Sequence, residues 1–442
     1  MRNIITAGAL GLVLTAPGLA IATTSDQERA EIEELKKQVA MVPMLLARIE
    51  QLEKANAAAQ QQAPPAVAAL ETRVAAIEES NDHQTDQLAQ GLANSNAMSW
   101  ARNIKWKADF RYRHEQFDVE NTTSDRVRHR LRVRLGMDAK ISDSLSGGFQ
   151  IATGESRDAR STNATLDNAN TNLEVGLDLA YVDWRPREDM LVTLGKQKYP
   201  WFRAGNSLFF DGDVEPEGVA FLYGGKTGVF ARAWGYWLEE MASAADSNVF
   251  GAQFGYAFDN GLTIAAGYWD YGAIEDQPIL NFNGTPAGNS VYTADAACTP
   301  SATGLTRCYT YDYNIAEADL QWNTRVGALP LMLFGGYMEN MDPDEFNTGY
   351  NLGFLLGKAS DPHTWEFGAM YMEVEKDAQL GAFFDSDFSD GLTQGSGYVL
   401  TGSWAPVKNM AMKATLFLND RSFDTTSEVD YKRLQVDLNY KF

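Results

Sequence analysis

The sequence predicts an all-β transmembrane barrel of sixteen antiparallel strands, preceded by an N-terminal α-helical coiled coil. Three observations predict the barrel. Charged and apolar residues alternate along many segments, short and long connections alternate between these segments, and the last segment ends on an aromatic residue. A bacterial outer-membrane barrel has an even number of strands, short turns at one end and longer loops at the other, so each observation is typical of one.

The clearest alternation lies between residues 126 and 141, where arginine first occupies every second position. Side chains that alternate with a period of two face opposite sides of a β-strand. The residues between the arginines, apart from His129, are apolar. A transmembrane barrel places such an apolar face in hydrocarbon and the charged face in a water-filled lumen. The arginines of this row are Arg126, Arg128, Arg130, Arg132 and Arg134.

Sixteen segments of similar texture follow one another from Ile104 to the C-terminus. Aromatic, glycine and β-branched residues recur in them, and turn residues separate them, as expected of strands. We therefore expect residues 104–442 to form the barrel domain. The segments begin near Ile104, Arg126, Leu145, Val175, Met190, Pro216, Thr227, Asn248, Leu262, Tyr309, Leu329, Thr348, Trp365, Gly397, Met410 and Tyr431.

The lengths of the connections give an independent test of the barrel. The second, fourth, sixth and eighth connections are short, at residues 142–144, 187–189, 224–226 and 259–261. The long connections all fall at odd positions, at residues 154–174, 200–215, 272–308 and 375–395. An outer-membrane barrel keeps this parity, because its periplasmic turns are short and its outer loops are long. A soluble β-sandwich has no reason to keep it.

The last segment favours the same class of protein. Its apolar residues alternate with polar ones up to the final residue, which is Phe442. This pattern is typical of outer-membrane proteins, in which a C-terminal phenylalanine serves as an assembly signal. The apolar residues are Leu434, Val436, Leu438, Tyr440 and Phe442.

The N-terminal region has a different character. Residues 1–22 contain Arg2, an apolar stretch and a small-residue cleavage site, which predict a secretory signal peptide. A helical anchor is the alternative. Residues 23–95 predict periplasmic helices whose apolar residues recur at spacings of three and four. This spacing favours a coiled coil that joins subunits, and its β-branched residues favour a coil of three helices. Amphipathic helices folded on the barrel are the alternative.

Composition limits the other function classes. The formal net charge of -22 argues against nucleic acid as a partner, because a basic surface is required for that. The sequence has no metal-ligand cluster and predicts no metal site and no cofactor. Its four histidines are poorly placed for a catalytic triad, so we expect no enzyme activity. Cys298 and Cys308 are close in an exported chain and predict a disulfide within the longest outer loop.

Residues 106–222 resemble the "putative porin" family of Gram-negative proteobacteria, in which a coiled coil also precedes the barrel. The resemblance implies a trimeric sixteen-stranded channel in the outer membrane. It names no substrate, because most substrates of the family are not assigned. The similar pieces are FRYRHE (Phe110–Glu115), RVRHRLRVRLGMDAKISD (Arg126–Asp143), STNATL (Ser161–Leu166), LDLAYVDW (Leu177–Trp184), LGKQKYPW (Leu194–Trp201) and DGDVEPEGVAF (Asp211–Phe221).

The resemblance also suggests where the channel narrows. In sixteen-stranded porins the third outer loop folds into the barrel. Here that loop carries Asp211, Asp213 and Glu215, which would face the arginine row together with Arg111 and Arg113 of the preceding strand. Opposed charges across a narrow channel orient and select solutes. Alternatively, these carboxylates lie on the surface and bind divalent ions near lipopolysaccharide.

We therefore expect an outer-membrane porin that allows passive diffusion of small hydrophilic solutes or ions through a charged constriction. Its expected partners are outer-membrane lipid, lipopolysaccharide and two further copies of the same chain. Two alternatives stay open: a channel selective for anions or organic acids, and a structural tether that links the outer membrane to the cell wall. The sequence does not decide between anions and cations, because the arginine row and the acidic net charge act in opposite directions.

Overall fold

A computed structural model describes residues 40–55, 102–122, 125–154, 158–167, 169–242, 245–280, 285–293, 307–423 and 425–442. The chain divides into two compact units, Met1–Met98 and Ser99–Phe442. The described part of the first unit is a helix at residues 40–55. No helix among the described residues is long and apolar enough to cross a membrane. The rest of the predicted coiled coil and the predicted signal peptide lie outside the described residues.

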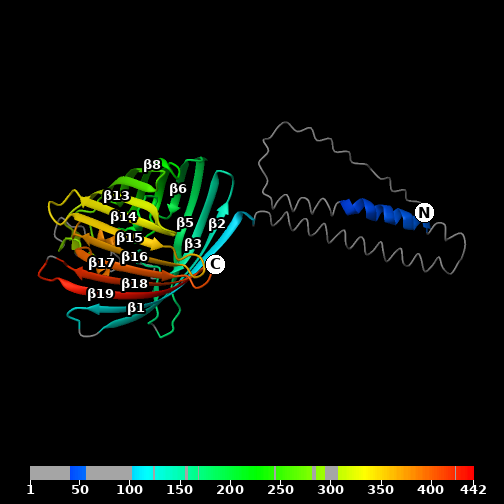
Figure 1. Ribbon diagram of the computed structural model, residues 1–442. Helices are drawn as coiled ribbons and strands as arrows, with labels where there is room; N and C mark the ends of the chain where they lie inside the picture. Colours follow the sequence, from blue (N-terminus) through cyan, green and yellow to red (C-terminus); the bar gives the residue numbers. More distant parts are fainter. Residues whose placement is uncertain are drawn as a thin grey trace. The chain divides into compact units, whose positions relative to one another are not determined.

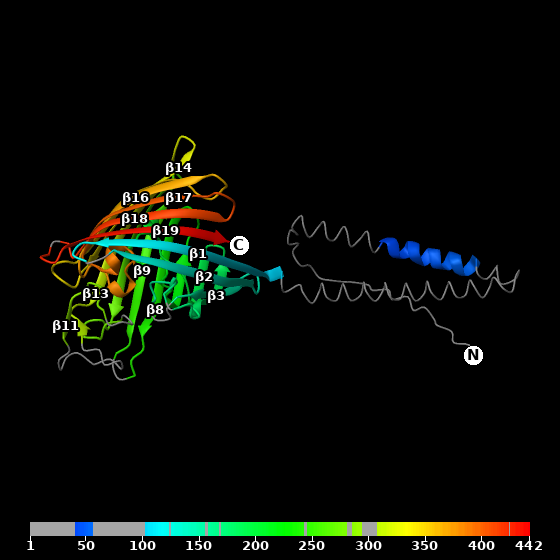
Figure 2. The same cartoon turned by 90° about the horizontal axis from the view of Figure 1, so that it is seen from below.

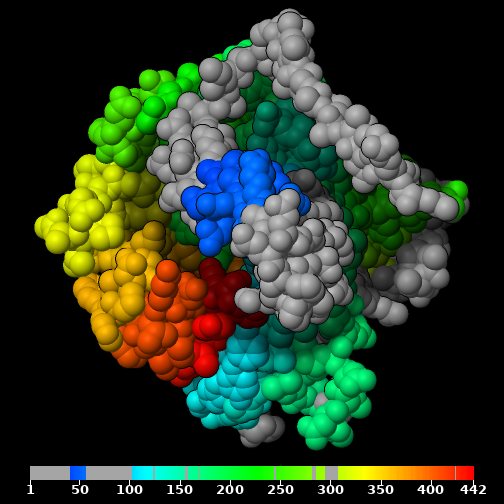
Figure 3. Space-filling view, turned by 90° about the vertical axis from the view of Figure 1, so that its right-hand side faces the viewer, coloured from blue at the N-terminus to red at the C-terminus, as the bar shows by residue number. Residues whose placement is uncertain are grey.

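The second unit is a closed barrel of sixteen antiparallel strands, as the sequence predicts (Figure 1). Each strand pairs with its neighbours along the chain, and β19 pairs with β1 to close the ring. Figure 2 shows β19 beside β1, and in Figure 3 the colours of the barrel follow the sequence around the ring. The strands are β1 (Ile104–Val119), β2 (Arg126–Lys140), β3 (Leu145–Thr153), β5 (Val175–Arg187), β6 (Met190–Lys196), β7 (Glu217–Tyr223), β8 (Gly228–Glu239), β9 (Ser247–Ala257), β10 (Leu262–Gly272), β13 (Tyr313–Val326), β14 (Leu329–Asn340), β15 (Thr348–Gly357), β16 (Trp365–Val374), β17 (Gly395–Trp404), β18 (Met410–Arg421) and β19 (Val429–Lys441).

Smaller elements lie in the connections. The strand β4 pairs with β2, and β11 and β12 form a separate hairpin. The tenth barrel strand was expected to begin near Tyr309, but Tyr309 belongs to this hairpin and the barrel strand begins at Tyr313. The bounds are β4 (Ala164–Thr165), β11 (Val291–Thr293), β12 (Arg307–Tyr309), and the 3-10 helices η2 (Ala204–Asn206), η3 (Gly381–Phe383) and η4 (Phe388–Gly391).

The connections alternate in length, so that the long ones share one end of the barrel. We call this end the loop end and the opposite end, which holds Ile104 and Phe442, the turn end. The turn between β9 and β10 closes at Gly261, whose φ of 87° is costly for other residues. Four long loops leave the loop end: the second (154–174), the third (197–216), the fifth (273–312) and the seventh (375–394).

The third loop folds into the barrel and is held there by aromatic packing. Trp201 and Phe210 of this loop are buried against Trp234 of β8 and Trp269 of β10. The ring centroids of Trp201 and Trp234 are 4.8 Å apart, and those of Phe210 and Trp269 are 5.7 Å apart. Such pairs contribute about 0.5–1.5 kcal/mol each beyond the burial of their area. The interior beside β8 and β10 is therefore packed, and the open space lies nearer the opposite strands.

The outer face carries large apolar side chains, as a lipid-facing surface requires. Leu352 on β15, Trp106 on β1 and Phe254 on β9 are each more than half exposed. Their neighbours along each strand point inward and include many polar side chains. The alternation predicted from the sequence therefore assigns the two faces correctly.

Candidate functional site

The strands β1, β2 and β19 place seven arginines on one part of the inner surface. We call this set the basic wall: Arg111, Arg113, Arg128, Arg130, Arg132, Arg134 and Arg433. Arg111 lies opposite Arg132, and Arg113 lies opposite Arg130 in the β1–β2 register. Directly opposed like charges destabilise a strand pair, so the wall requires counter-charges.

The first counter-charges come from the same three strands. Asp109 accepts hydrogen bonds from Arg132 at 3.0 Å and Arg134 at 2.7 Å. Asp437 of β19 accepts two hydrogen bonds from Arg113, at 2.6 Å and 2.9 Å. A guanidinium that binds both oxygens of one carboxylate is held firmly in position, because the fork geometry fixes both groups. These pairs therefore order the wall as well as neutralise part of it.

Glu115 lies at the centre of the part of the basic wall that is nearest the loop end. Its carboxylate is fully buried and accepts hydrogen bonds at 2.5 Å from both Arg128 and Arg433. The ring of Phe117, one step further along β1, lies under three guanidinium groups. The distances to its centroid are 5.4 Å from Arg126, 5.2 Å from Arg128 and 4.8 Å from Arg433. These cation–π contacts stabilise the arginines where they crowd together.

The third loop brings one carboxylate to the wall. Asp213 lies 3.7 Å from Arg132 and 3.8 Å from Arg134, and it accepts hydrogen bonds from the backbone and hydroxyl of Thr162. Burial opposes the ionisation of Asp213, but Arg132 and the neighbouring arginines outweigh it and lower the pKa of Asp213. The carboxylate is therefore ionised against the wall.

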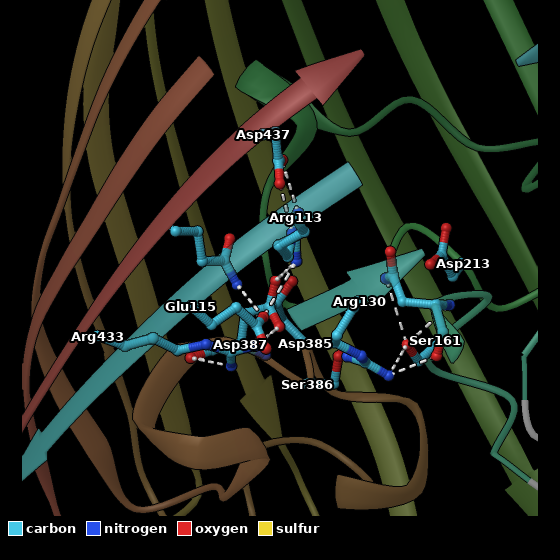
Figure 4. A network of polar contacts seen from close by, with 12 residues as sticks. Arg113, Glu115, Arg130, Ser161, Asp213, Asp385, Ser386, Asp387, Arg433 and Asp437 are labelled. Atoms are coloured by element: carbon cyan, nitrogen blue, oxygen red, sulfur yellow. Dashed lines mark hydrogen bonds and ion pairs between the residues drawn. The ribbon is translucent and has the colours of Figure 1, made fainter. Parts of the chain in front are cut away.

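The seventh loop brings a second carboxylate, which is not among the residues predicted from the sequence. Asp387 lies 3.1 Å from Arg113 and 2.8 Å from Arg433 (Figure 4). Burial raises the pKa of Asp387, but Arg433 and Arg113 outweigh burial and lower it. A signal for this loop was present in the sequence. Residues 380–388 read LGAFFDSDF, which is too apolar for a loop in water, and Phe384 and Phe388 are fully buried.

Asp211 has a different role from Asp213. It accepts a hydrogen bond from the backbone amide of Ser386 at 2.8 Å, and its own amide donates to the carbonyl of Phe383 at 2.9 Å. Asp211 therefore joins the third loop to the seventh loop. Burial, followed by the charges of Asp385 and Asp213, raises the pKa of Asp211 well above its usual value. Burial also raises the pKa of Asp385, to about 6.

Three other predicted residues do not pair with Asp213 or Asp387. Glu215 pairs with Lys198 of its own loop, and burial raises the pKa of Glu215 to about 8. Arg126 is exposed at the loop end. Arg130 donates to Ser161 at 3.1 Å and to the carbonyl of Asn163 at 2.6 Å, both in the second loop.

The structure describes one of the two cysteines. Cys308 is fully buried in β12 and disulfide-bonded. Cys298 lies outside the described residues, so the pairing of these two cysteines stays a prediction. Among the described residues, no group of three or more metal-ligating side chains is close enough together to hold a metal ion.

A cavity of about 780 Å³ lies beside the basic wall. Its lining runs from Asp213 and Asp387 of the two loops to Lys441 and Glu366 near the turn end. Nine basic and five acidic side chains line it, a formal excess of four positive charges. The cavity thus has the opposite sign from the whole chain, whose formal net charge is -22.

Several solved structures are similar to this chain. OprB of Pseudomonas putida has a TM-score of 0.51 at 11% identity, and the alignment covers 79% of this chain and 97% of that chain. OmpF of Salmonella typhi, in complex with daunomycin, has a TM-score of 0.48 at 12% identity, covering 77% and 97%. OmpT of Vibrio cholerae has a TM-score of 0.44 at 11% identity, covering 77% and 99%.

No curated protein matches the sequence. A family described as "Putative porin" matches residues 71–299 and 305–442, which is most of the chain. The family match and the closed sixteen-stranded barrel agree on an outer-membrane location. The chain therefore belongs to the "Putative porin" family of outer-membrane β-barrels.

Proposed function

We propose that the barrel is a passive diffusion channel whose narrowest zone lies between the basic wall and two inward-folded acidic loops. One observation carries the proposal: Asp213 and Asp387, from different loops, both reach guanidinium groups of the wall. The sequence suggested opposed charges across open space. The ion pairs instead indicate that the loops are bound directly to the wall, and these contacts would give the narrow zone a fixed shape.

The proposed channel prefers anions. The positive lining of the cavity supports this, because charge close to the path of an ion acts on it more strongly than charge elsewhere on the protein. Arg111 adds to the effect, since its nearest carboxylate, Asp437, is 3.9 Å away and its hydrogen bonds go to neutral groups. Lys413 lines the same cavity, and among the described residues no carboxylate lies within ion-pair distance of it.

Purified protein in a planar lipid bilayer tests this proposal. We expect single-channel currents in KCl and, under a tenfold salt gradient, a reversal potential displaced toward that of chloride. Replacing Arg130 and Arg132 by glutamine removes two positive charges and should shift the reversal potential toward that of potassium. A protein that inserts but carries no current would refute the channel. Currents that favour potassium in the wild type would refute the anion preference.

We also propose that the protein is a homotrimer whose coiled coil lies in the periplasm. On the described helix, Val42 and Leu46 are exposed apolar residues at a spacing of four. On the outer barrel surface, Tyr112 hydrogen-bonds His129 at 2.9 Å, and the ring of His114 lies 5.0 Å from that of His129. Polar groups are unfavourable in hydrocarbon, so a neighbouring subunit covering them is favoured.

Deletion of residues 23–95 tests the role of the helical region. The truncated barrel should still insert, and its trimer should dissociate at a lower temperature in detergent. An unchanged assembly would contradict a joining role. Retention of the full chain on peptidoglycan, lost on the same deletion, would favour the alternative of a structural tether to the cell wall.

A further inference from the structure

The cavity beside the basic wall has an apolar side that the proposed diffusion channel does not require. Five inward-facing apolar residues line it from five consecutive strands, β14 to β18. They are Phe334, Leu355, Met370, Val399 and Phe417. A pore that only passes hydrated ions gains nothing from apolar side chains, which do not replace the water of an ion.

Four of these residues form a continuous strip. In the strand registers, Phe417 lies opposite Val399, Val399 opposite Met370, Met370 opposite Gly353, and Gly353 opposite Phe334. Opposed side chains on adjacent strands have their Cβ atoms about 4.5–5.5 Å apart, so the strip has no polar break. At Gly353 a Cβ atom would come within 2.4 Å of the Phe334 ring, so the glycine makes room for that ring.

The strip is mostly covered by the inward-folded loops, and its edge reaches the cavity. Phe334 and Phe417 are each only 4% exposed. Leu355, one row nearer the turn end, and Leu208 of the third loop are half-buried and line the cavity. The accessible apolar surface is therefore a ledge of limited size. It suits one ring or one short branched chain and not a lipid.

Cationic groups line the same cavity nearer the turn end than this ledge. Lys413 lies on β18 four residues from Phe417 and on the same face, which is about 13 Å along the strand at about 3.3 Å per residue. Lys413 lies opposite Asp437 of β19, and Asp437 lies opposite Arg113 of β1. Arg111 lies two residues from Arg113 on β1, nearer the turn end. A lysine side chain is long and flexible, so its ammonium can approach a ligand that lies on the apolar ledge.

We propose that this cavity binds organic carboxylates with an apolar body, such as a ring or a branched chain. The carboxylate lies between Lys413 and Arg111, and the body lies against Leu355 and the edge of the strip. This inference depends on the proposed channel and names the class of solute that would bind in its cavity. Guanidinium and ammonium groups bind carboxylates well. The ledge buries apolar surface of the ligand, which an inorganic anion does not have.

Three probes of the full-length protein test the inference. Benzoate has the charge and the ring, acetate has the charge alone, and benzyl alcohol has the ring alone. We expect benzoate to halve the single-channel chloride current at a concentration about tenfold below that of acetate, which corresponds to about 60 Å² of buried ring surface. Benzyl alcohol should have little effect.

Variants separate the two halves of the site. Leu355→Asn should abolish the difference between the blocking concentrations of benzoate and acetate. Thr401→Val, which enlarges the apolar surface of a lining residue, should increase that difference. Lys413→Gln should weaken the block by benzoate and the block by acetate by a similar factor. Lys358→Gln is the matched control, because Lys358 lies in a turn at the same end and does not line the cavity.

Equal block by benzoate and acetate in the wild type would overturn this inference and leave the channel intact. Equal block by benzoate and benzyl alcohol would also overturn it, because the basic groups would then play no part. If no current flows, the proposed channel fails, and the site is tested by calorimetric titration of the detergent-solubilised protein with benzoate and acetate. Tighter binding of benzoate would support the site, and no difference would overturn it.

Discussion

Asp211 and Asp213 are two residues apart in the third loop, and their surroundings shift their pKa values in opposite directions. Asp213 faces Arg132 and Arg134, which keep its pKa low and its carboxylate ionised. Asp211 is buried beside other carboxylates, and its raised pKa favours the neutral form. We therefore predict that Asp213→Asn changes ion selectivity and that Asp211→Asn, which replaces a neutral carboxyl, changes it little.

The size of the effect follows from Coulomb's law. Asp213 lies 3.7 Å from Arg132, so an anion on the other side of that guanidinium would be about 7 Å from the carboxylate. Removing one unit charge at about 7 Å changes the energy of a monovalent ion by about 0.6 kcal/mol even at the dielectric constant of water. That is about a threefold change for each ion, in opposite directions, and so up to about an eightfold rise in the ratio of chloride to potassium permeability.

The assay is the reversal potential under a tenfold KCl gradient at low salt, with both variants measured beside the wild type. In Asp213→Asn it should move toward the chloride potential, and in Asp211→Asn it should stay near the wild-type value. The shift should shrink near 1 M salt, where the screening length falls to about 3 Å. Equal shifts in the two variants, or none in Asp213→Asn, would refute the assigned charge states.

Three further predictions concern stability and the fifth loop. Arg433→Gln removes one of the guanidinium partners of Glu115 and of Asp387, and each lost charge-assisted hydrogen bond should cost about 1.5–3 kcal/mol of unfolding free energy. Adding Asp387→Asn should recover part of the loss of melting temperature, and no recovery would contradict the pairing. Because the pKa of Glu215 is higher in the folded protein (about 8) than its ordinary 4.5, the folded state binds this proton more tightly, and stability falls as pH rises between these values. Glu215→Gln should therefore reduce the difference in melting temperature between pH 5 and pH 9, whereas the exposed Glu217→Gln should not. Thiol titration of denatured protein purified without reductant should find neither Cys298 nor Cys308 free, since we predict that they form a disulfide; two reactive thiols would exclude the bond.

Several features of the barrel could be predicted from the sequence because each depends on residues close together in the chain. The period of two in the row from Arg126 to Arg134 fixes which side chains share a face, and turn residues such as Gly261 mark where a strand reverses. The number of strands and the parity of their connections follow from these local signals. The arginine row was therefore placed on the inner surface correctly.

The sequence alone pointed to the acidic third loop but did not distinguish its carboxylates from one another. It suggested the third loop as the acidic partner of the arginines, and the structure places Asp213 of that loop at the wall. It treated Asp211 and Glu215 as equivalent to Asp213, but one joins two loops and the other pairs with Lys198. Neighbouring carboxylates look alike in a sequence, because their burial and partners depend on how the loop is folded.

Long-range contacts decided what remains. Asp387 reaches Arg113 although 274 residues separate them, and no local pattern encodes that approach. The sign of the cavity is a similar case. The sequence determines a net charge of -22, but the cavity is positive because wall carboxylates such as Asp109 and Asp437 are bound behind the arginines and do not line it. Local periodicity thus determined the barrel and its two faces, whereas only the tertiary structure decided which charges meet, because electrostatic interaction depends on distance in space and not along the chain.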